Sequence, residues 1–126
     1  PAHRPCISYN AYFDGHQGKS PSRACHPTRQ DAYMEAWEQG IIDAIRENTG
    51  YVSKARDIQL KALSTMQTSG SAMERAKAEQ LFARMNSRIR HLEKRTTRLD
   101  ALLATERPGE RGDERAVMTA TVRDTE

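Results

Sequence analysis

Apolar residues recur at helical spacing along most of the chain. In the first such segment, one face carries Tyr9, Tyr12, Phe13 and His16. Their spacing of three and four predicts a short helix over residues 8–17. Gly18 follows, at the point where a helix end favours the left-handed conformation. Residues 19–27 contain two prolines and are predicted to form a connector.

A second helix is predicted to begin at Thr28, which forms a weak capping box with Asp31. Its apolar face carries Met34, Trp37, Ile41 and Ala44 or Ile45. Asn48-Thr49-Gly50 is typical of a helix end. Residues 52–67 are then predicted to form a separate helix with an apolar side of Val52, Ala55, Ile58, Ala62 and Met66. We expect Tyr12, Phe13 and Trp37 to pack the core of the N-terminal part.

The most regular apolar pattern follows a predicted turn at residues 68–71. Ser71 and Glu74 form a full capping box, which predicts a helix start. Alternating steps of three and four then connect Phe82, Met85, Ile89, Leu92, Thr96, Leu99 and Leu103. We call these residues the seam, because they occupy positions of a coiled-coil heptad, the a positions being Phe82, Ile89, Thr96 and Leu103 and the d positions Met85, Leu92 and Leu99. The pattern predicts a helix over residues 72–105.

These elements predict an all-α chain in three parts. Residues 1–50 would form a two-helix head, residues 51–106 a helical hairpin with a long coiled-coil-like second arm, and residues 107–126 a disordered tail. A helix over residues 52–67 is too short to cover the whole seam. We therefore expect the chain to form a homo-oligomer or to bind a partner helix through it.

The net charge of +3 belongs almost entirely to the middle of the chain. Residues 51–106 carry eleven Lys/Arg against six Asp/Glu, which is typical of a surface that binds an anionic partner. The residues expected to bind it are Lys19, Arg23, Arg84, Arg88, Arg90, Lys94, Arg95 and Arg98. RNA and an acidic protein surface both satisfy this pattern, and a solvated coiled-coil face is the structural alternative. Because no aromatic residue follows Phe82, we expect nucleic acid to be bound through its backbone charge.

Gly18-Lys19-Ser20 ends like a phosphate-binding loop, but Phe13 stands where such a loop needs its first glycine. No nucleophile and base can be paired from their spacing, so we expect neither enzyme activity nor a cofactor.

The cysteines and histidines at Cys6, His16, Cys25 and His26 match no common zinc spacing. Free thiols, a disulfide and a metal site all remain open for them. Two cysteines are too few for a secreted disulfide framework, and the sequence shows neither a signal peptide nor an apolar stretch of membrane-spanning length. We expect a cytoplasmic protein.

The N-terminal part resembles the ribosome modulation factor family. Its members pair a helix ending in G-x-x-G-[KR]-S with a Cys-Pro or Asn-Pro-aromatic connector and a second helix carrying W-x-x-G-W. The matching elements here are Gly15-x-x-Gly18-Lys19-Ser20, Cys25-His26-Pro27 and Trp37-x-x-Gly40, with Ile41 in place of the last Trp. The resemblance covers residues 8–46. It implies a compact two-helix module that binds the small ribosomal subunit and idles translation.

These observations lead us to expect a non-enzymatic interaction protein that binds the ribosome, RNA or another nucleoprotein complex and modulates it sterically. Two alternatives remain. One is an inhibitor from a phage or mobile element that acts on a host protein complex. The other is a structural homo-oligomer held together by the seam.

Overall fold

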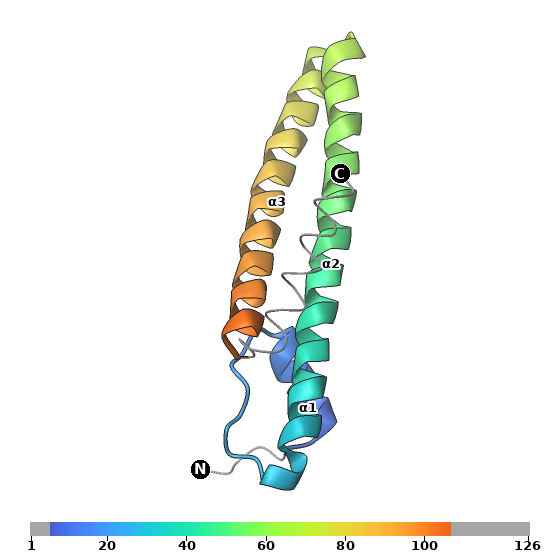
Figure 1. Ribbon diagram of the computed structural model, residues 1–126. Helices are drawn as coiled ribbons and strands as arrows, with labels where there is room; N and C mark the ends of the chain where they lie inside the picture. Colours follow the sequence, from blue (N-terminus) through green and yellow to red (C-terminus); the bar gives the residue numbers. More distant parts are fainter. Residues whose placement is uncertain (1–5, 107–126) are drawn as a thin grey trace, which may run out of the picture. The chain divides into compact units, whose positions relative to one another are not determined.

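The computed structural model describes residues 6–106, and within that range the prediction of an all-α chain is confirmed. The helices are α1 (Ser8–His16), α2 (Pro27–Thr68) and α3 (Ala72–Glu106) (Figure 1). None of the three combines the length and the apolar character that crossing a bilayer would require, in the part of the chain described. The tail predicted at residues 107–126 lies outside the described residues.

The predicted helix end at Asn48-Thr49-Gly50 is wrong, because α2 continues through it for 42 residues in all. The heptad steps of three and four run without a break along α2. The a positions are Ile45, Val52, Gln59 and Met66, and the d positions are Ile41, Asn48, Ala55 and Ala62. Packing along this stripe outweighs the local preference of Gly50 to end a helix. As a result α2 exceeds α3 in length, 42 residues against 35, while α3 itself begins at the predicted residue and extends one residue beyond the predicted range of 72–105.

The continuous helix makes Gly50 a residue whose replacement should stabilise the fold. Nothing lies within 4 Å of the position that a Cβ atom would occupy there. Gly50→Ala is therefore expected to raise the free energy of unfolding by about 0.5–1 kcal/mol. Urea denaturation followed by far-UV circular dichroism measures the change. A lower midpoint for the variant would contradict a continuous α2.

The described residues form two compact units that do not follow chain order. The head unit consists of residues 6–43 and 98–106, and the hairpin unit of residues 44–97. The head unit therefore combines α1, the first part of α2 and the last turns of α3.

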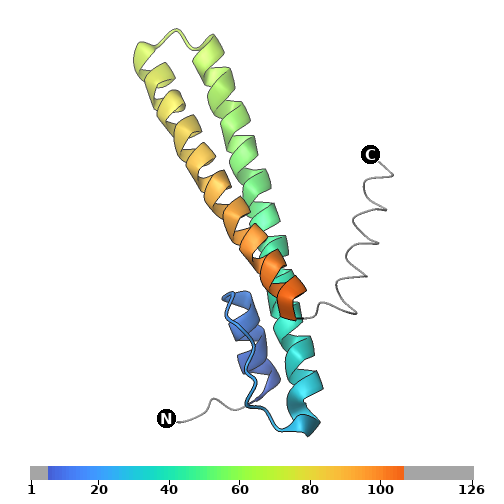
Figure 2. The same cartoon turned by 60° about the vertical axis from the view of Figure 1, so that its left-hand side comes forward.

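In the head unit, α1 crosses α2 at two glycines (Figure 2). A Cβ atom on Gly15 would lie 2.0 Å from the carbonyl oxygen of Trp37, and one on Gly40 would lie 2.1 Å from that of Tyr12. No Cβ atom tolerates such distances, so the two backbones touch and only glycine fits at either position. Trp37 is fully buried beside this crossing, and its Nε1 donates a hydrogen bond of 2.8 Å to the carbonyl oxygen of Lys19.

Because the helices cross so closely, the buried face of α1 differs from the aromatic face that the sequence predicted. The buried residues of α1 are Ala11, Asp14 and Gly15, whereas Tyr9 is 75% exposed and Phe13 is 43% exposed. Small side chains occupy an interface where the backbones touch, and the large aromatic ones lie at its edge. The prediction that Phe13 packs the head core is therefore wrong, while Trp37 does occupy it.

The end of α1 follows the prediction. Gly18 has a φ of +75°, and its N–H donates to the carbonyl oxygen of Gly15 at 2.9 Å. The N–H of Lys19 donates to the carbonyl oxygen of Asp14, also at 2.9 Å. This pair of bonds is a Schellman motif. Because it uses the backbone N–H groups of residues 18 and 19, the Gly-Lys-Ser sequence does not form a phosphate loop.

In the hairpin unit, α2 and α3 lie side by side and antiparallel (Figures 1 and 2). The Oγ atom of Ser71 accepts a hydrogen bond of 3.2 Å from the N–H of Glu74, as the capping box predicts. Small residues of α2, including Ala55 and Ala62, are buried in the same unit as larger α3 residues such as Ile89 and Leu92. Small and large residues that alternate in this way let two helices interdigitate closely.

One polar pair lies within this apolar stripe. Asn48 is 5% exposed, and its Nδ2 donates a hydrogen bond of 3.2 Å to the Oγ1 of Thr96. A satisfied polar pair at heptad core positions favours one register of two helices over its neighbours. Asn48 and Thr96 therefore help to set the alignment of α2 against α3.

Candidate nucleic-acid interface

Four of the predicted seam residues are buried within the chain itself. Ile89 and Leu92 belong to the hairpin unit and Leu99 and Leu103 to the head unit, and each is at most 8% exposed. Phe82 and Met85 are partly exposed. A second chain was expected because the helix before the turn was predicted to be short. Since α2 begins at Pro27 and runs without a break to Thr68, that reason no longer holds.

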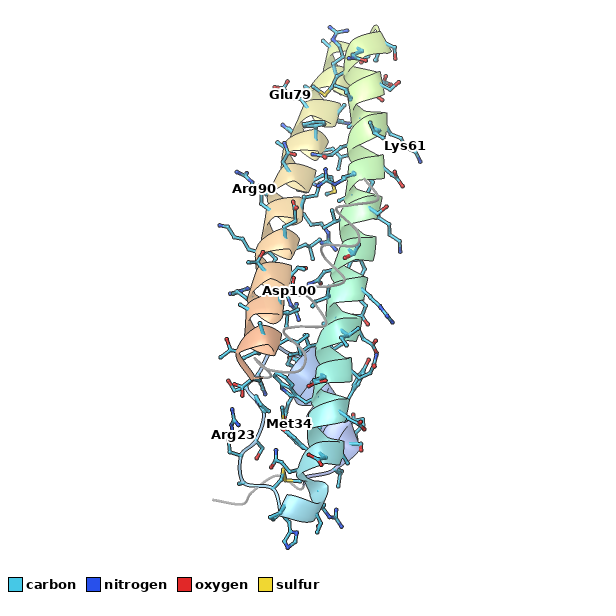
Figure 3. The ribbon with its side chains drawn as sticks, in the orientation of Figure 1. Arg23, Met34, Lys61, Glu79, Arg90 and Asp100 are labelled. Atoms are coloured by element: carbon cyan, nitrogen blue, oxygen red, sulfur yellow. A yellow bond between two sulfur atoms is a disulfide. The ribbon has the colours of Figure 1, made fainter. Side chains whose placement is uncertain are left out.

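The eight predicted basic residues lie at the surface but not on one face. Lys19, Arg23 and Arg98 belong to the head unit, where Arg23 forms an ion pair with Glu106. The hairpin unit carries Arg84, Arg88, Arg90, Lys94 and Arg95. Of these, Arg84, Arg88 and Arg95 occupy the c and g positions that flank one side of the seam. Arg90 and Lys94 occupy b and f positions, and Figure 3 shows Arg90 projecting away from α2.

Two sets of contacts define the two faces of the hairpin unit. On one face, the Nη2 of Arg56 lies 3.8 Å from the Oε1 of Glu93, and both residues are at e positions. We call this the Glu93 face, and it comprises the e and b positions of both helices. On the other face, the Cζ of Arg88 lies 6.0 Å from the centre of the Tyr51 ring, and both residues are at g positions. We call this the Tyr51 face, and it comprises the g and c positions.

The two faces differ strongly in charge. The charged residues of the Tyr51 face are Glu47, Lys54, Lys61, Glu74, Lys77, Arg84, Arg88 and Arg95. Those of the Glu93 face are Arg46, Arg56, Glu79, Arg90 and Glu93. The Tyr51 face thus has six Lys/Arg against two Asp/Glu, and the Glu93 face has three against two. The positive charge that the sequence places in the middle of the chain is concentrated on one side of the hairpin.

An aromatic ring lies among these cations. Tyr51 is 45% exposed, with the Nζ of Lys54 at 5.9 Å and the Cζ of Arg88 at 6.0 Å from its ring centre. The sequence prediction placed no aromatic residue in the basic surface, because the basic run after Phe82 contains none. The local signal was the spacing of three between Tyr51 and Lys54. The approach of Arg88 follows only from the pairing of the two helices.

The four residues considered for a metal have other partners. Cys6 and Cys25 form a disulfide, with their Sγ atoms 2.09 Å apart, which decides between the open alternatives for the thiols. The ring of His16 stacks on that of Tyr12 at 6.0 Å between centroids. The Nδ1 of His26 accepts a hydrogen bond of 3.2 Å from the N–H of Thr28 at the start of α2. Across residues 6–106, no three His, Cys, Asp or Glu side chains come together as a metal site requires.

The helix α2 begins at Pro27, one residue before the predicted start. Thr28 therefore lies inside the helix, and His26 occupies the capping position. His26 precedes the helix, and its carbonyl oxygen accepts a hydrogen bond of 2.8 Å from the N–H of Arg29. Proline is well suited to the first helical position, because its fixed φ is helical and no N–H is needed there.

No family model, curated protein or solved structure matches the chain. The resemblance of residues 8–46 to the ribosome modulation factor family therefore stays a prediction. In the structure, the matching residues Gly15, Trp37 and Gly40 take part in the contact between α1 and α2, and the carbonyl oxygen of Lys19, just beyond α1, accepts the hydrogen bond of Trp37. Their spacing is accounted for by that packing, and it does not by itself require RNA.

Proposed function

We propose that the protein binds RNA through the Tyr51 face of its hairpin unit and acts by steric occupation, without catalysing a reaction. The observation that carries this proposal is the difference between the two faces, with six Lys/Arg against two Asp/Glu on one and three against two on the other. A one-sided array of cations on a helix pair is suited to a partner with regularly spaced negative charges.

The layout of the cations favours a nucleic-acid backbone over an acidic protein surface. On α3 the strip runs from Lys77 to Arg95, about 27 Å at 1.5 Å per residue, which is long enough for several consecutive phosphates. The strip on α3 contains one lysine, Lys77, and three arginines, which are Arg84, Arg88 and Arg95. The planar guanidinium group of arginine binds phosphate in a bidentate manner.

The head unit has the opposite charge balance. Its described residues carry four Lys/Arg against seven Asp/Glu. RNA contact is therefore assigned to the hairpin unit, and the head unit supplies bulk that would block access to the bound site. The proposed target is a ribosome-like ribonucleoprotein in the cytoplasm. A homo-oligomeric scaffold is the weaker candidate, because α2 already packs on the seam of the hairpin unit.

Salt dependence of RNA binding tests this function. Fluorescence anisotropy of a labelled single-stranded RNA should report binding at about 50 mM salt, and the affinity should fall by about twentyfold to fiftyfold at about 200 mM. That loss corresponds to the release of counterions from roughly three or four phosphates. Absence of RNA binding at the lower salt concentration would contradict the proposal. Equal affinity for labelled polyglutamate would assign the face to an acidic protein instead.

A further inference from the structure

We infer that Tyr51, Lys54 and Arg88 form a nucleotide subsite for single-stranded RNA. In this subsite one base stacks on the Tyr51 ring, and the two cations bind the phosphates on either side of that base. The inference rests on the proposed function. It adds that the bound RNA is single-stranded and that Tyr51 is the residue that distinguishes a single strand from a duplex.

The first support is the exposure of the ring. Tyr51 is 45% exposed, whereas Ala55, one turn further along α2, is 2% exposed. The Tyr51 side chain therefore lies beside the hairpin core rather than within it. Nearly half of the residue is therefore accessible without any change in the packing of α2 on α3.

The second support is the position of the two cations. The Nζ of Lys54 and the Cζ of Arg88 come from different helices and lie at 5.9 and 6.0 Å from the ring centre. Cations at this distance are attracted by the ring quadrupole, which limits the movement of all three side chains. A nucleotide offers the matching chemistry, since it joins a flat base to an anionic phosphate.

The third support concerns strandedness. Bases of a duplex are already stacked on one another, whereas those of a single strand can stack on an exposed aromatic side chain. The surrounding Tyr51 face holds six Lys/Arg and binds phosphate in either form of RNA. Only the ring distinguishes the two forms, so its removal should affect one and spare the other.

Anisotropy measurements with oligoadenylate and with the duplex that it forms with oligouridine test the subsite. Tyr51→Leu should weaken oligoadenylate binding about tenfold or more and leave duplex binding within about twofold. Tyr51→Phe should retain wild-type binding to both. Ile58→Ala is the matched control, because Ile58 is 38% exposed at the next g position of the same face and should affect neither probe.

A further variant reports stacking directly, whatever the stability of Tyr51→Leu. In Tyr51→Trp, the emission of the new indole should be quenched by oligoadenylate and unchanged by the duplex, while the fully buried Trp37 contributes a constant emission. If Tyr51→Leu loses the same affinity for oligoadenylate and for the duplex, or loses affinity for neither, the subsite is contradicted while the proposed function is not. Failure of the wild-type protein to bind both RNAs would instead reject the proposed function.

Discussion

Gly40→Ala is expected to unfold the head unit. A Cβ atom at this position would lie 2.1 Å from the carbonyl oxygen of Tyr12 and 2.8 Å from the backbone nitrogen of His16. Both atoms belong to the backbone of α1 and cannot rotate away, so α1 must separate from α2. We expect a loss of about 3 kcal/mol or more in the free energy of unfolding. The fluorescence of Trp37, the only tryptophan in the chain, reports the transition in urea.

The control is the same substitution in the same helix. Gly50→Ala places its methyl group where nothing lies within 4 Å and should stabilise the protein, so the two variants are expected to have effects of opposite sign. Gly15→Ala should behave like Gly40→Ala, because its Cβ atom would lie 2.0 Å from the carbonyl oxygen of Trp37. A Gly40→Ala protein as stable as the wild type would show that α1 does not pack on α2 in this way.

The second large effect is expected from the removal of charge on the Tyr51 face. Lys61 and Arg84 occupy c positions on α2 and α3, and both side chains are exposed. If each binds a phosphate, Lys61→Gln combined with Arg84→Gln should lower RNA affinity about a hundredfold. The slope of log affinity against log salt should become shallower by about 1.4, which is the contribution of two contacts to a single strand.

An equal loss of charge on the other face provides the control. Arg56 and Arg90 also lie on α2 and α3, at e and b positions, and both are exposed. Figure 3 shows Lys61 and Arg90 projecting outward from their helices. The pair of substitutions Arg56→Gln and Arg90→Gln should change RNA affinity by no more than about threefold, since the Arg56–Glu93 ion pair is exposed and contributes little to stability. Equal losses from both double variants would mean that only the total charge matters.

Local signals in the sequence predicted the helix ends best. Gly18 at the end of α1 and Ser71 before α3 act through hydrogen bonds to residues no more than four positions away, so their roles can be inferred from short patterns. The stop signal at Gly50 is equally local, but it was outweighed by packing along the whole of α2. The sequence carries an unbroken heptad pattern across this signal, and giving that pattern more weight than the signal would have predicted the continuous helix.

Contacts between distant residues explain the remaining differences. The burial of α1 depends on Gly15 and Gly40, 25 positions apart, and nothing near Phe13 indicates that small residues would form the interface. Likewise, Tyr51 and Arg88 meet only because the helices pair in one register. The sequence therefore predicted the basic segment and the residues that carry its charge. It could not predict which of them share a face with an aromatic ring.

The most direct test of RNA binding by the Tyr51 face is methyl NMR of the full chain labelled at Ile and Leu. Ile58 and Leu81 lie at g positions on this face, whereas Leu60 and Leu63 lie at b and e positions on the Glu93 face. Addition of single-stranded RNA should shift the methyl signals of Ile58 and Leu81 and leave those of Leu60 and Leu63 in place. Shifts confined to Leu60 and Leu63, or no shifts in the hairpin unit, would contradict RNA binding by the Tyr51 face.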